Sequence, residues 1–320
     1  MAARSHGGPP AAGRAVSVIV AANHHQKASD KDHSTARLST PADDADAIAA
    51  AVALATTTDG CVLVLGDDSS TTRESFRARQ QGDRADLGLL GGQRALFDAL
   101  RQSGVPLVVV LARMGVIADE HLFAHAGTLL DAGVPGQAGG LAVARVLCGL
   151  AEPGGRLPVS VPRSAGHLPC FLGAPPAARR GYGFCPTGPL LPFGFGLSYT
   201  RLEVVAARLL TPRLRLGAAA EVEIEIVNRG ARPGSEVVQI YHRDLVASRT
   251  RPARELAAFV KVRLEPGATR RCRITVSAGR LGWQDDARCL VQEPGAHRLW
   301  VATGADPLGG VELTLEVIGG

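Results

Sequence analysis

The stretch Pro-Leu-Leu-Pro-Phe-Gly-Phe-Gly-Leu-Ser-Tyr-Thr, residues 189–200, separates two regions with different sequence patterns. Its prolines and glycines prevent a helix, while Phe193, Phe195 and Tyr199 need a surface to pack on. The chain as a whole is only 4% aromatic, so this local enrichment is a strong signal. We therefore expect an ordered connector between two folded bodies.

Before the connector, short apolar runs alternate with segments of helix length. The runs at 61–65 and 105–112 are apolar on both faces, as in strands that are buried within a sheet. Thr40 is a good N-cap and is followed by proline at the first helical position. Strands that alternate with helices predict a parallel sheet covered on two sides. Helices are expected at 40–55, 93–102 and 137–147.

After the connector the hydrophobic period changes to two. Residues 221–227 alternate charged and aliphatic side chains and are followed by an Asn-Arg-Gly turn. Short alternating strands at this spacing are typical of an antiparallel β-sandwich, whose core would hold Trp283 and Trp300. Further strands are expected at 237–241, 272–276, 299–302 and 311–317.

These patterns predict an α/β domain followed by an all-β domain. The first residues are polar and contain a histidine and aspartate cluster, which we interpret as a flexible solvated segment rather than a metal site. We expect neither a metal nor a cofactor. The expected parts are an irregular segment at 1–39, an α/β sandwich domain at 40–165, the ordered connector at 166–200 and a β-sandwich at 201–320.

Composition excludes several classes of partner. The net charge of +5 is carried by scattered arginines, which does not indicate a nucleic-acid surface. No apolar run is long enough to cross a membrane.

The six cysteines lack the spacing of a disulfide framework, and only Cys170 and Cys185 could pair, which the sequence leaves open. Residues 15–22 only faintly resemble a signal-peptide core, so a cytoplasmic location is slightly favoured over secretion or the periplasm.

A long polar loop follows the strand at 61–65. It begins Gly-Asp-Asp and ends Gly-Asp-Arg-Ala-Asp, with carboxylates, arginines and hydroxyls between. In an open parallel sheet, ligand sites form at the carboxyl ends of the strands. Loops of this length in compact domains are usually functional or disordered, so this loop is the first candidate site.

The order Gly-Asp at 66–67, Thr-Thr-Arg-Glu at 71–74 and Gly-Asp-Arg at 82–84 resembles glycoside hydrolase family 3, in its β-glucosidase and β-xylosidase branch. The resemblance implies an α/β sandwich joined to a fibronectin-III-like domain, and hydrolysis of terminal β-glycosidic bonds. Further matching segments lie, in order, at 88–93, 134–140, 154–162, 178–182, 237–241, 251–256 and 264–269.

The resemblance also implies roles for individual residues. It identifies Glu74 with the general acid/base, which protonates the leaving oxygen and then activates water. Asp83, Arg84, Arg179 and Arg180 are weaker candidates for contacts with the substrate, a β-linked glucoside or xyloside. The alternative is that Glu74 is a solvated loop carboxylate and the arginines are solvated charges.

The nucleophile is expected to be absent from this chain. Retaining glycosidases need two carboxyl groups about 5 Å apart. The family carries its nucleophilic aspartate on an N-terminal (β/α)8 barrel of about 250 residues, whereas only 39 residues precede Thr40. We therefore expect an incomplete glycosidase that is inactive alone, with a separate barrel polypeptide as a candidate partner.

Two departures from the family pattern keep other interpretations open. An aromatic residue commonly precedes the Pro-Gly-Gln segment, where this chain has Gly133 and Val134. Where the family usually continues Asn-Gly-Arg-Pro after the second strand, this chain has Arg-Met-Gly-Val at 113–116, which puts sugar recognition in doubt. A non-catalytic carbohydrate-binding or protein-interaction module is the main alternative. A nucleotide-binding loop is not supported, because no G-x-G-x-x-G or G-K-[ST] motif follows the strand at 61–65.

Overall fold

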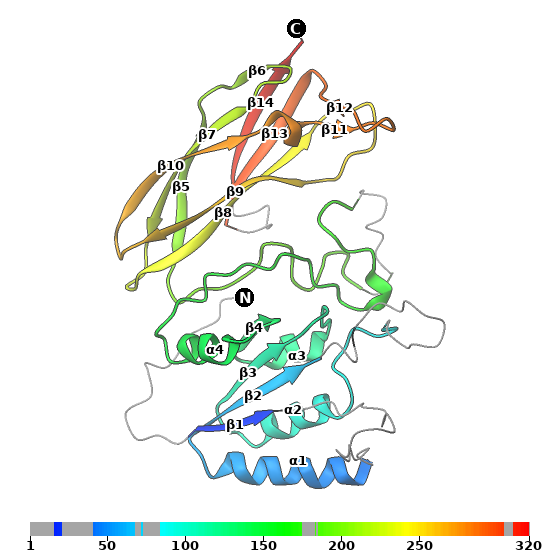
Figure 1. The fold of residues 1–320 in the computed structure, drawn as a ribbon, viewed down its shortest axis with the longest axis vertical. Helices are drawn as coiled ribbons and strands as arrows, with labels where there is room; N and C mark the ends of the chain where they lie inside the picture. The colour runs from blue at the N-terminus through cyan, green and yellow to red at the C-terminus, as the bar shows by residue number, and fades with distance from the viewer. Residues whose placement is uncertain are drawn as a thin grey trace. The chain divides into compact units, whose positions relative to one another are not determined.

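A computed structural model describes residues 16–20, 41–67, 72, 84–174, 183, 185–303 and 310–319. The chain divides into two compact units, which we describe separately (Figure 1). The first comprises Met1–Ala151 with Arg163–Gly166, and the second comprises Glu152–Pro162 with His167–Gly320.

The first unit is built on a parallel sheet with the strand order β1-β2-β3-β4. Strands β2 and β3 carry the two predicted apolar runs, and the side chains of Leu63, Leu65, Val109 and Leu111 are buried in the core. The predicted parallel sheet with accompanying helices is confirmed. The strands are β1 (Val16–Val20), β2 (Gly60–Gly66), β3 (Leu107–Ala112) and β4 (Leu129–Gly133).

Helices connect these strands. Helix α2 buries Leu96, Phe97 and Leu100, which lie on one face at helical spacing. The α2 helix ends before Gly104, whose φ of +78° is a left-handed conformation that favours glycine. The helices are α1 (Pro41–Thr56), α2 (Gln93–Gln102), α3 (Glu120–His125) and α4 (Gly139–Leu147), and Figure 1 shows α1 next to α2.

The first unit departs from expectation in three elements. We expected residues 1–39 to be irregular, but β1 lies within them and pairs in parallel with residues 60–64 of β2. Its sequence, Val-Ser-Val-Ile-Val, is mostly β-branched and extends the sheet at the free edge of β2. The other two, α3 and β4, were not anticipated, because α3 is short and Asp131 interrupts the apolar pattern of β4.

The second unit is a β-sandwich, as predicted, and its strands pair antiparallel except for β6, which pairs in parallel with β14. A three-stranded sheet with the order β10-β7-β5 faces a five-stranded sheet with the order β6-β14-β13-β8-β9. Alternate residues of β7, namely Val222, Ile224 and Ile226, point into the shared core. The strands are β5 (Leu202–Leu209), β6 (Arg213–Arg215), β7 (Ala220–Asn228), β8 (Gly234–Asp244), β9 (Glu255–Leu264), β10 (Thr269–Val276), β13 (Gly295–Ala302) and β14 (Val311–Ile318).

Three short elements complete this unit, namely helix α5 (Ala278–Leu281) and the hairpin strands β11 (Trp283–Gln284) and β12 (Leu290–Val291). Trp300 is buried, with 8% of its surface exposed, but it lies outside the core between the sheets: its neighbours Leu299 and Val301 belong to that core, whereas arginine side chains lie over the Trp300 ring. Trp283 is only half-buried, because it lies on the peripheral hairpin, where the Arg249 guanidinium covers its ring at 4.7 Å.

Residues 152–162 belong to the second compact unit, together with the described connector residues from His167 onward. Leu157 and residues 194–195 exchange backbone hydrogen bonds of 2.8 and 2.9 Å. The buried Arg156 donates from Nη2 to Glu236 Oε2 of β8 at 2.5 Å. A short 3-10 helix, Ala165–His167, lies where the connector begins. All six cysteines lie in the described part of the chain and form no disulfide, so Cys170 and Cys185 are not joined.

Candidate functional site

The carboxyl ends of β2, β3 and β4 meet at one edge of the parallel sheet. Three charged residues lie there: Asp67 directly after β2, Arg113 directly after β3, and Asp131 within β4. Together with Thr72 and Arg84, they form a set of contacts that we call the carboxyl-edge network. This edge is where open parallel sheets build their ligand sites.

Asp67 is the centre of the carboxyl-edge network. Its side chain is fully buried, and its Oδ2 atom accepts hydrogen bonds from Thr72 Oγ1 at 2.7 Å and Arg84 Nη1 at 3.0 Å. Its Oδ1 atom accepts from the backbone N–H of Met114 at 2.6 Å. Charge-assisted hydrogen bonds of this kind are stronger than neutral ones. One carboxylate therefore joins three segments of the chain.

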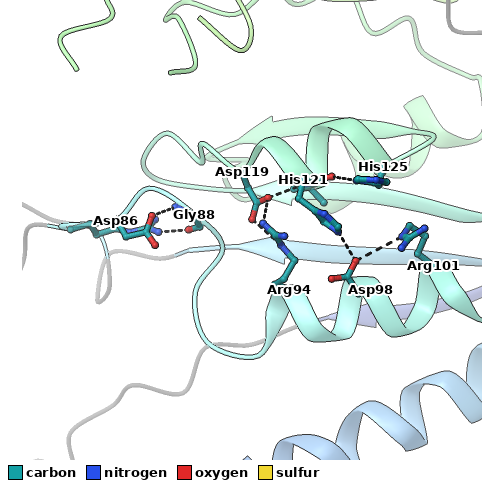
Figure 2. A network of polar contacts seen from close by, with 10 residues as sticks. Asp86, Gly88, Arg94, Asp98, Arg101, Asp119, His121 and His125 are labelled. Carbon is teal, nitrogen blue, oxygen red and sulfur yellow. Dashed lines mark hydrogen bonds and ion pairs between the residues drawn. The ribbon is translucent and has the colours of Figure 1, made fainter. Parts of the chain in front are cut away.

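Arg84 is committed to contacts within this unit. Its side chain is 9% exposed, and besides Asp67 it donates from Nη2 to the carbonyl oxygen of Gly88. The turn at Gly88 is further held by Asp86, whose Oδ1 atom accepts from the Gly88 N–H at 2.8 Å (Figure 2). The residues that flank segment 68–83 are thus joined directly by the Asp67–Arg84 ion pair.

Gly66 and Gln93 set the position of Asp67. Gln93 is buried at the start of α2 and forms two hydrogen bonds with the Gly66 backbone, donating to its oxygen at 2.8 Å and accepting from its N–H at 2.9 Å. Gly66 has a φ of +151°, and a Cβ atom there would lie 1.7 Å from the backbone oxygen of Ala112. Only glycine allows the ends of β2 and β3 to approach this closely.

A second ion pair joins β3 to β4. Arg113 donates from Nε to both carboxylate oxygens of Asp131 at 3.0 Å, and from Nη1 to the carbonyl oxygen of Gly115 at 2.8 Å. A Cβ atom at Gly115 would lie 2.7 Å from Thr72 Cγ2, so this glycine gives room to the Thr72 side chain. The Arg-Met-Gly-Val sequence that departs from the family pattern therefore has a structural role in the carboxyl-edge network.

Helices α2 and α3 are linked by further polar contacts, which Figure 2 shows. Asp119 caps α3 by accepting from the Leu122 N–H at 2.9 Å, and it also accepts from Arg94 of α2 at 3.1 Å. Burial raises the pKa of Asp119, but the hydrogen bonds from Arg94 and Leu122 outweigh it, so the pKa lies below its usual value. His121 Nε2 lies 2.7 Å from Asp98 Oδ1 and adds a second link between the two helices.

Of the five predicted site residues, the structure describes Arg84. Glu74, Asp83, Arg179 and Arg180 lie outside the described residues. Asp67 and Gln93 lie in segments that carry the family resemblance, but prediction from sequence gave neither residue a role. A Gly-Asp pair directly after a buried strand is a signal that could have indicated Asp67, whereas Gln93 carries no such local signal.

Within the described ranges, no group of three or more histidine, cysteine, aspartate or glutamate side chains is arranged to hold a metal ion. The helices in this part of the chain are also too short or too polar to cross a membrane.

Comparison with known proteins finds two domains, but their boundary differs from that of the compact units, since the first match also includes residues 152–162 and 167–199. The glycosyl hydrolase family 3 C-terminal domain matches residues 8–199, and the fibronectin type III-like domain matches residues 236–305. A β-xylosidase of Formosa agariphila is 34% identical over 272 residues, which are 83% of this chain and 37% of the relative. A periplasmic β-glucosidase of Salmonella typhimurium is 30% identical over 262 residues, which are 78% of this chain and 34% of the relative.

Solved structures agree with these relatives. A β-glucosidase from Erythrobacter marinus superposes with a TM-score of 0.84 at 36% identity, covering 88% of this chain and 37% of that one. A β-glucosidase from Listeria innocua in complex with glucose superposes with a TM-score of 0.76 at 28% identity, covering 88% of this chain and 39% of that one. The chain thus spans little more than a third of these proteins and corresponds to their C-terminal part. By its domains, its motifs and its relatives, the chain belongs to glycoside hydrolase family 3.

Proposed function

We propose that this chain supplies the acid/base side of a site that hydrolyses terminal β-linked glucosides or xylosides. The proposal rests on the buried Asp67–Arg84 ion pair, which joins the two residues that flank segment 68–83 at the carboxyl edge of the sheet. This segment contains Glu74. Relatives that this chain resembles are named as β-xylosidases and β-glucosidases.

In this proposal Glu74 is the general acid/base. As a carboxylic acid it protonates the leaving glycosidic oxygen, and as a carboxylate it then activates the water that releases the sugar. The nucleophilic carboxylate comes from a (β/α)8 barrel, which we propose as the partner polypeptide. Asp83, Arg179 and Arg180 are kept as candidates for substrate contacts.

Arg84 has a different proposed role. Both terminal nitrogens of its guanidinium are occupied, one by Asp67 and one by Gly88. We therefore propose that Arg84 supports the segment that carries Glu74 rather than contacting the sugar.

The test mixes the full chain with a separately produced family 3 barrel and measures hydrolysis of aryl β-glucosides and β-xylosides. Glu74→Gln should slow hydrolysis most for poor leaving groups, which depend on proton donation, and least for activated aryl groups. Glu265→Gln, an exposed carboxylate on a turn of the sandwich, is the matched control and should leave rates unchanged. No gain on mixing, or an unchanged leaving-group dependence in Glu74→Gln, would overturn the proposal.

The tryptophans give the carbohydrate-binding alternative little support, although Phe171 and Phe259 are exposed aromatic side chains. Sugar-binding modules present exposed aromatic faces. Both tryptophans of this chain have a ring covered by an arginine, with the Arg254 guanidinium 4.7 Å from the centre of Trp300 and that of Arg249 4.7 Å from the centre of Trp283.

For the compartment we propose the cytoplasm, because the cysteine spacing is not that of a disulfide framework. Fractionation of cells that express the tagged chain tests this. Recovery in the periplasm, where the Salmonella relative is named to lie, would overturn it.

A further inference from the structure

Two histidines lie side by side in the core of the β-sandwich. His242 belongs to β8 and His297 to the neighbouring strand β13, and neither side chain is exposed. Nε2 of His242 lies 2.8 Å from Nδ1 of His297, and the rings stack with their centres 5.1 Å apart. A direct hydrogen bond between two buried imidazoles holds one proton, so the protonation states of the two rings depend on each other. We call these residues the histidine pair.

The contacts determine where the protons lie. His297 Nε2 is 3.4 Å from the backbone oxygen of Glu293, which can only accept, so this nitrogen carries a proton. Nδ1 of the neutral His297 ring is then bare and accepts from the Nε2–H of His242. This leaves Nδ1 of His242 as a bare nitrogen that is buried and has no hydrogen-bond partner. In this assignment each ring carries one proton and has a single tautomer.

Charged groups surround the histidine pair on several elements. Asp244 of β8 is paired with His297 across the sheet, and Glu255 of β9 is paired with His242. Glu255 binds the Arg251 guanidinium at 2.6 Å, and Glu293 precedes β13. On the remaining side, the buried Leu315 of β14 is paired with His297. Asp244 and Glu293 attract a positive charge on His297, whereas Arg251 repels one on His242.

The histidine pair is connected to a surface loop. His297 donates to the Glu293 backbone, and the Glu293 carboxylate accepts from the Ser248 N–H at 2.9 Å. The same loop is held by Asp244, which accepts from the Val246 N–H at 3.2 Å, and by the Leu245 N–H, which donates to Ala296 at 3.2 Å. A change in the pair therefore reaches residues 245–248 through a short series of contacts.

We propose that the histidine pair is an acid-sensitive switch. At neutral pH residues 245–248 keep their hydrogen bonds to Asp244, Glu293 and Ala296, which we call the closed state, and in acid these bonds break, which gives the opened state. Protonation of His242 at its bare Nδ1 would place a positive charge in the core, at a nitrogen that faces no hydrogen-bond acceptor. Burial, His297 and Arg251 lower the pKa of His242 to about 3, from 6.5 for a free side chain. Between pH 6.5 and about pH 3, the opened state therefore binds more protons than the closed state. The closed state loses stability as the pH falls below 6.5. Protonation of Asp244, whose pKa is raised by burial, acts in the opposite direction and reduces the effect.

The test is hydrogen exchange of the full chain at pH 7 and pH 5, corrected for intrinsic exchange rates. The opening equilibrium at the amides of Leu245, Val246 and Ser248 should rise about 25-fold from pH 7 to pH 5, less the opposing effect of Asp244, since the opened state binds one more proton. His242→Gln should abolish this pH dependence, whereas His125→Gln, an exposed histidine of α3, should retain it. An opening that does not change with pH, or a His242→Gln variant with the dependence intact, would overturn the proposal.

A second measurement does not depend on the variant folding. In an NMR titration of the unaltered chain, the His242 ring should stay uncharged in the folded protein at every pH at which it remains folded above 4. A His242 ring that titrates near pH 6.5 in the folded state would also overturn the proposal. The test uses neither substrate nor barrel, so its outcome is independent of the proposed glycosidase function.

Discussion

Asp67 in the α/β unit and Glu236 in the β-sandwich are both buried carboxylates with an arginine partner, but their surroundings differ. Asp67 accepts hydrogen bonds from three separate segments, at Thr72, Arg84 and Met114. Glu236 accepts from Arg156 and from the N–H of its own neighbour Val237, and burial raises its pKa above the usual range despite these bonds. Burial alone therefore does not mark a site. The segments from which the donors come show that Asp67 joins loops at a sheet edge, whereas Glu236 binds the segment at residues 152–162 to strand β8 of the sandwich.

The two units can be followed by different signals. Both tryptophans belong to the sandwich, and helices α1 to α4 belong to the α/β unit. Tryptophan fluorescence therefore reports unfolding of the second unit, and circular dichroism at helical wavelengths reports unfolding of the first.

The largest effect is expected from Gly66→Ala, which disrupts the α/β unit next to Asp67. The new Cβ atom would lie 1.7 Å from the Ala112 oxygen, so the ends of β2 and β3 must separate. We expect a loss of more than about 4 kcal/mol in the free energy of unfolding followed by circular dichroism. Gly104→Ala is the control: its φ is +78° but no atom lies within 4 Å, so only the backbone cost of about 1 kcal/mol applies. Equal losses in the two variants would contradict the steric explanation.

Asp67→Asn should have the next largest effect. It leaves the buried Arg84 guanidinium without its counter-charge, which costs about 3 kcal/mol in the transition followed by circular dichroism. Asp86→Asn serves as the control, since Asp86 is exposed and bonds only the nearby Gly88 N–H, and it should change stability by less than about 0.5 kcal/mol. In a double-mutant cycle with Arg84→Gln, the losses should not add. Simple additivity would show that the ion pair does not couple these residues.

Arg156→Met tests the other buried carboxylate, Glu236 of the sandwich, by removing its arginine partner. It leaves Glu236 buried without its partner, so we expect a loss of about 2 kcal/mol at pH 8 in the tryptophan-monitored transition. Because burial raises the folded-state pKa of Glu236, the folded protein takes up a proton more readily than the unfolded chain. The loss should therefore shrink as the pH is lowered toward 5. A loss that stays constant from pH 8 to pH 5 would exclude an ionised Glu236 as its cause.

The smallest effect is expected from Asp119→Ala, which removes the cap of α3 and the contact with Arg94. We expect a loss of about 1 kcal/mol near neutral pH, measured by circular dichroism. The pKa of Asp119 lies below its usual 3.8, so its contribution is complete above that value and is lost as the pH falls through the folded-state pKa. The difference between the two proteins should thus be constant from pH 7 to pH 5 and vanish in stronger acid. A difference that grows in acid would contradict this role.

Local sequence patterns predicted much of the fold. The apolar run at 61–65 became β2, the expected helix at 93–102 is α2 with the same bounds, and the alternating run at 221–227 lies within β7. Strand β1 was missed because the pattern around it is polar and irregular, and β4 because its aspartate serves an ion pair with Arg113. The roles of Glu74, Asp83, Arg179 and Arg180 remain predictions from the family resemblance.

The amino-acid sequence alone determined the two-part architecture and the family, because hydrophobic period and motif order are local properties that can be read along the chain. Only the tertiary structure decided that Arg84 is bound to Asp67, that Gln93 holds Gly66, and that His242 meets His297. These partners are 17, 27 and 55 residues apart. Such contacts depend on how distant strands and helices pack, and no local pattern encodes which buried polar groups will face each other.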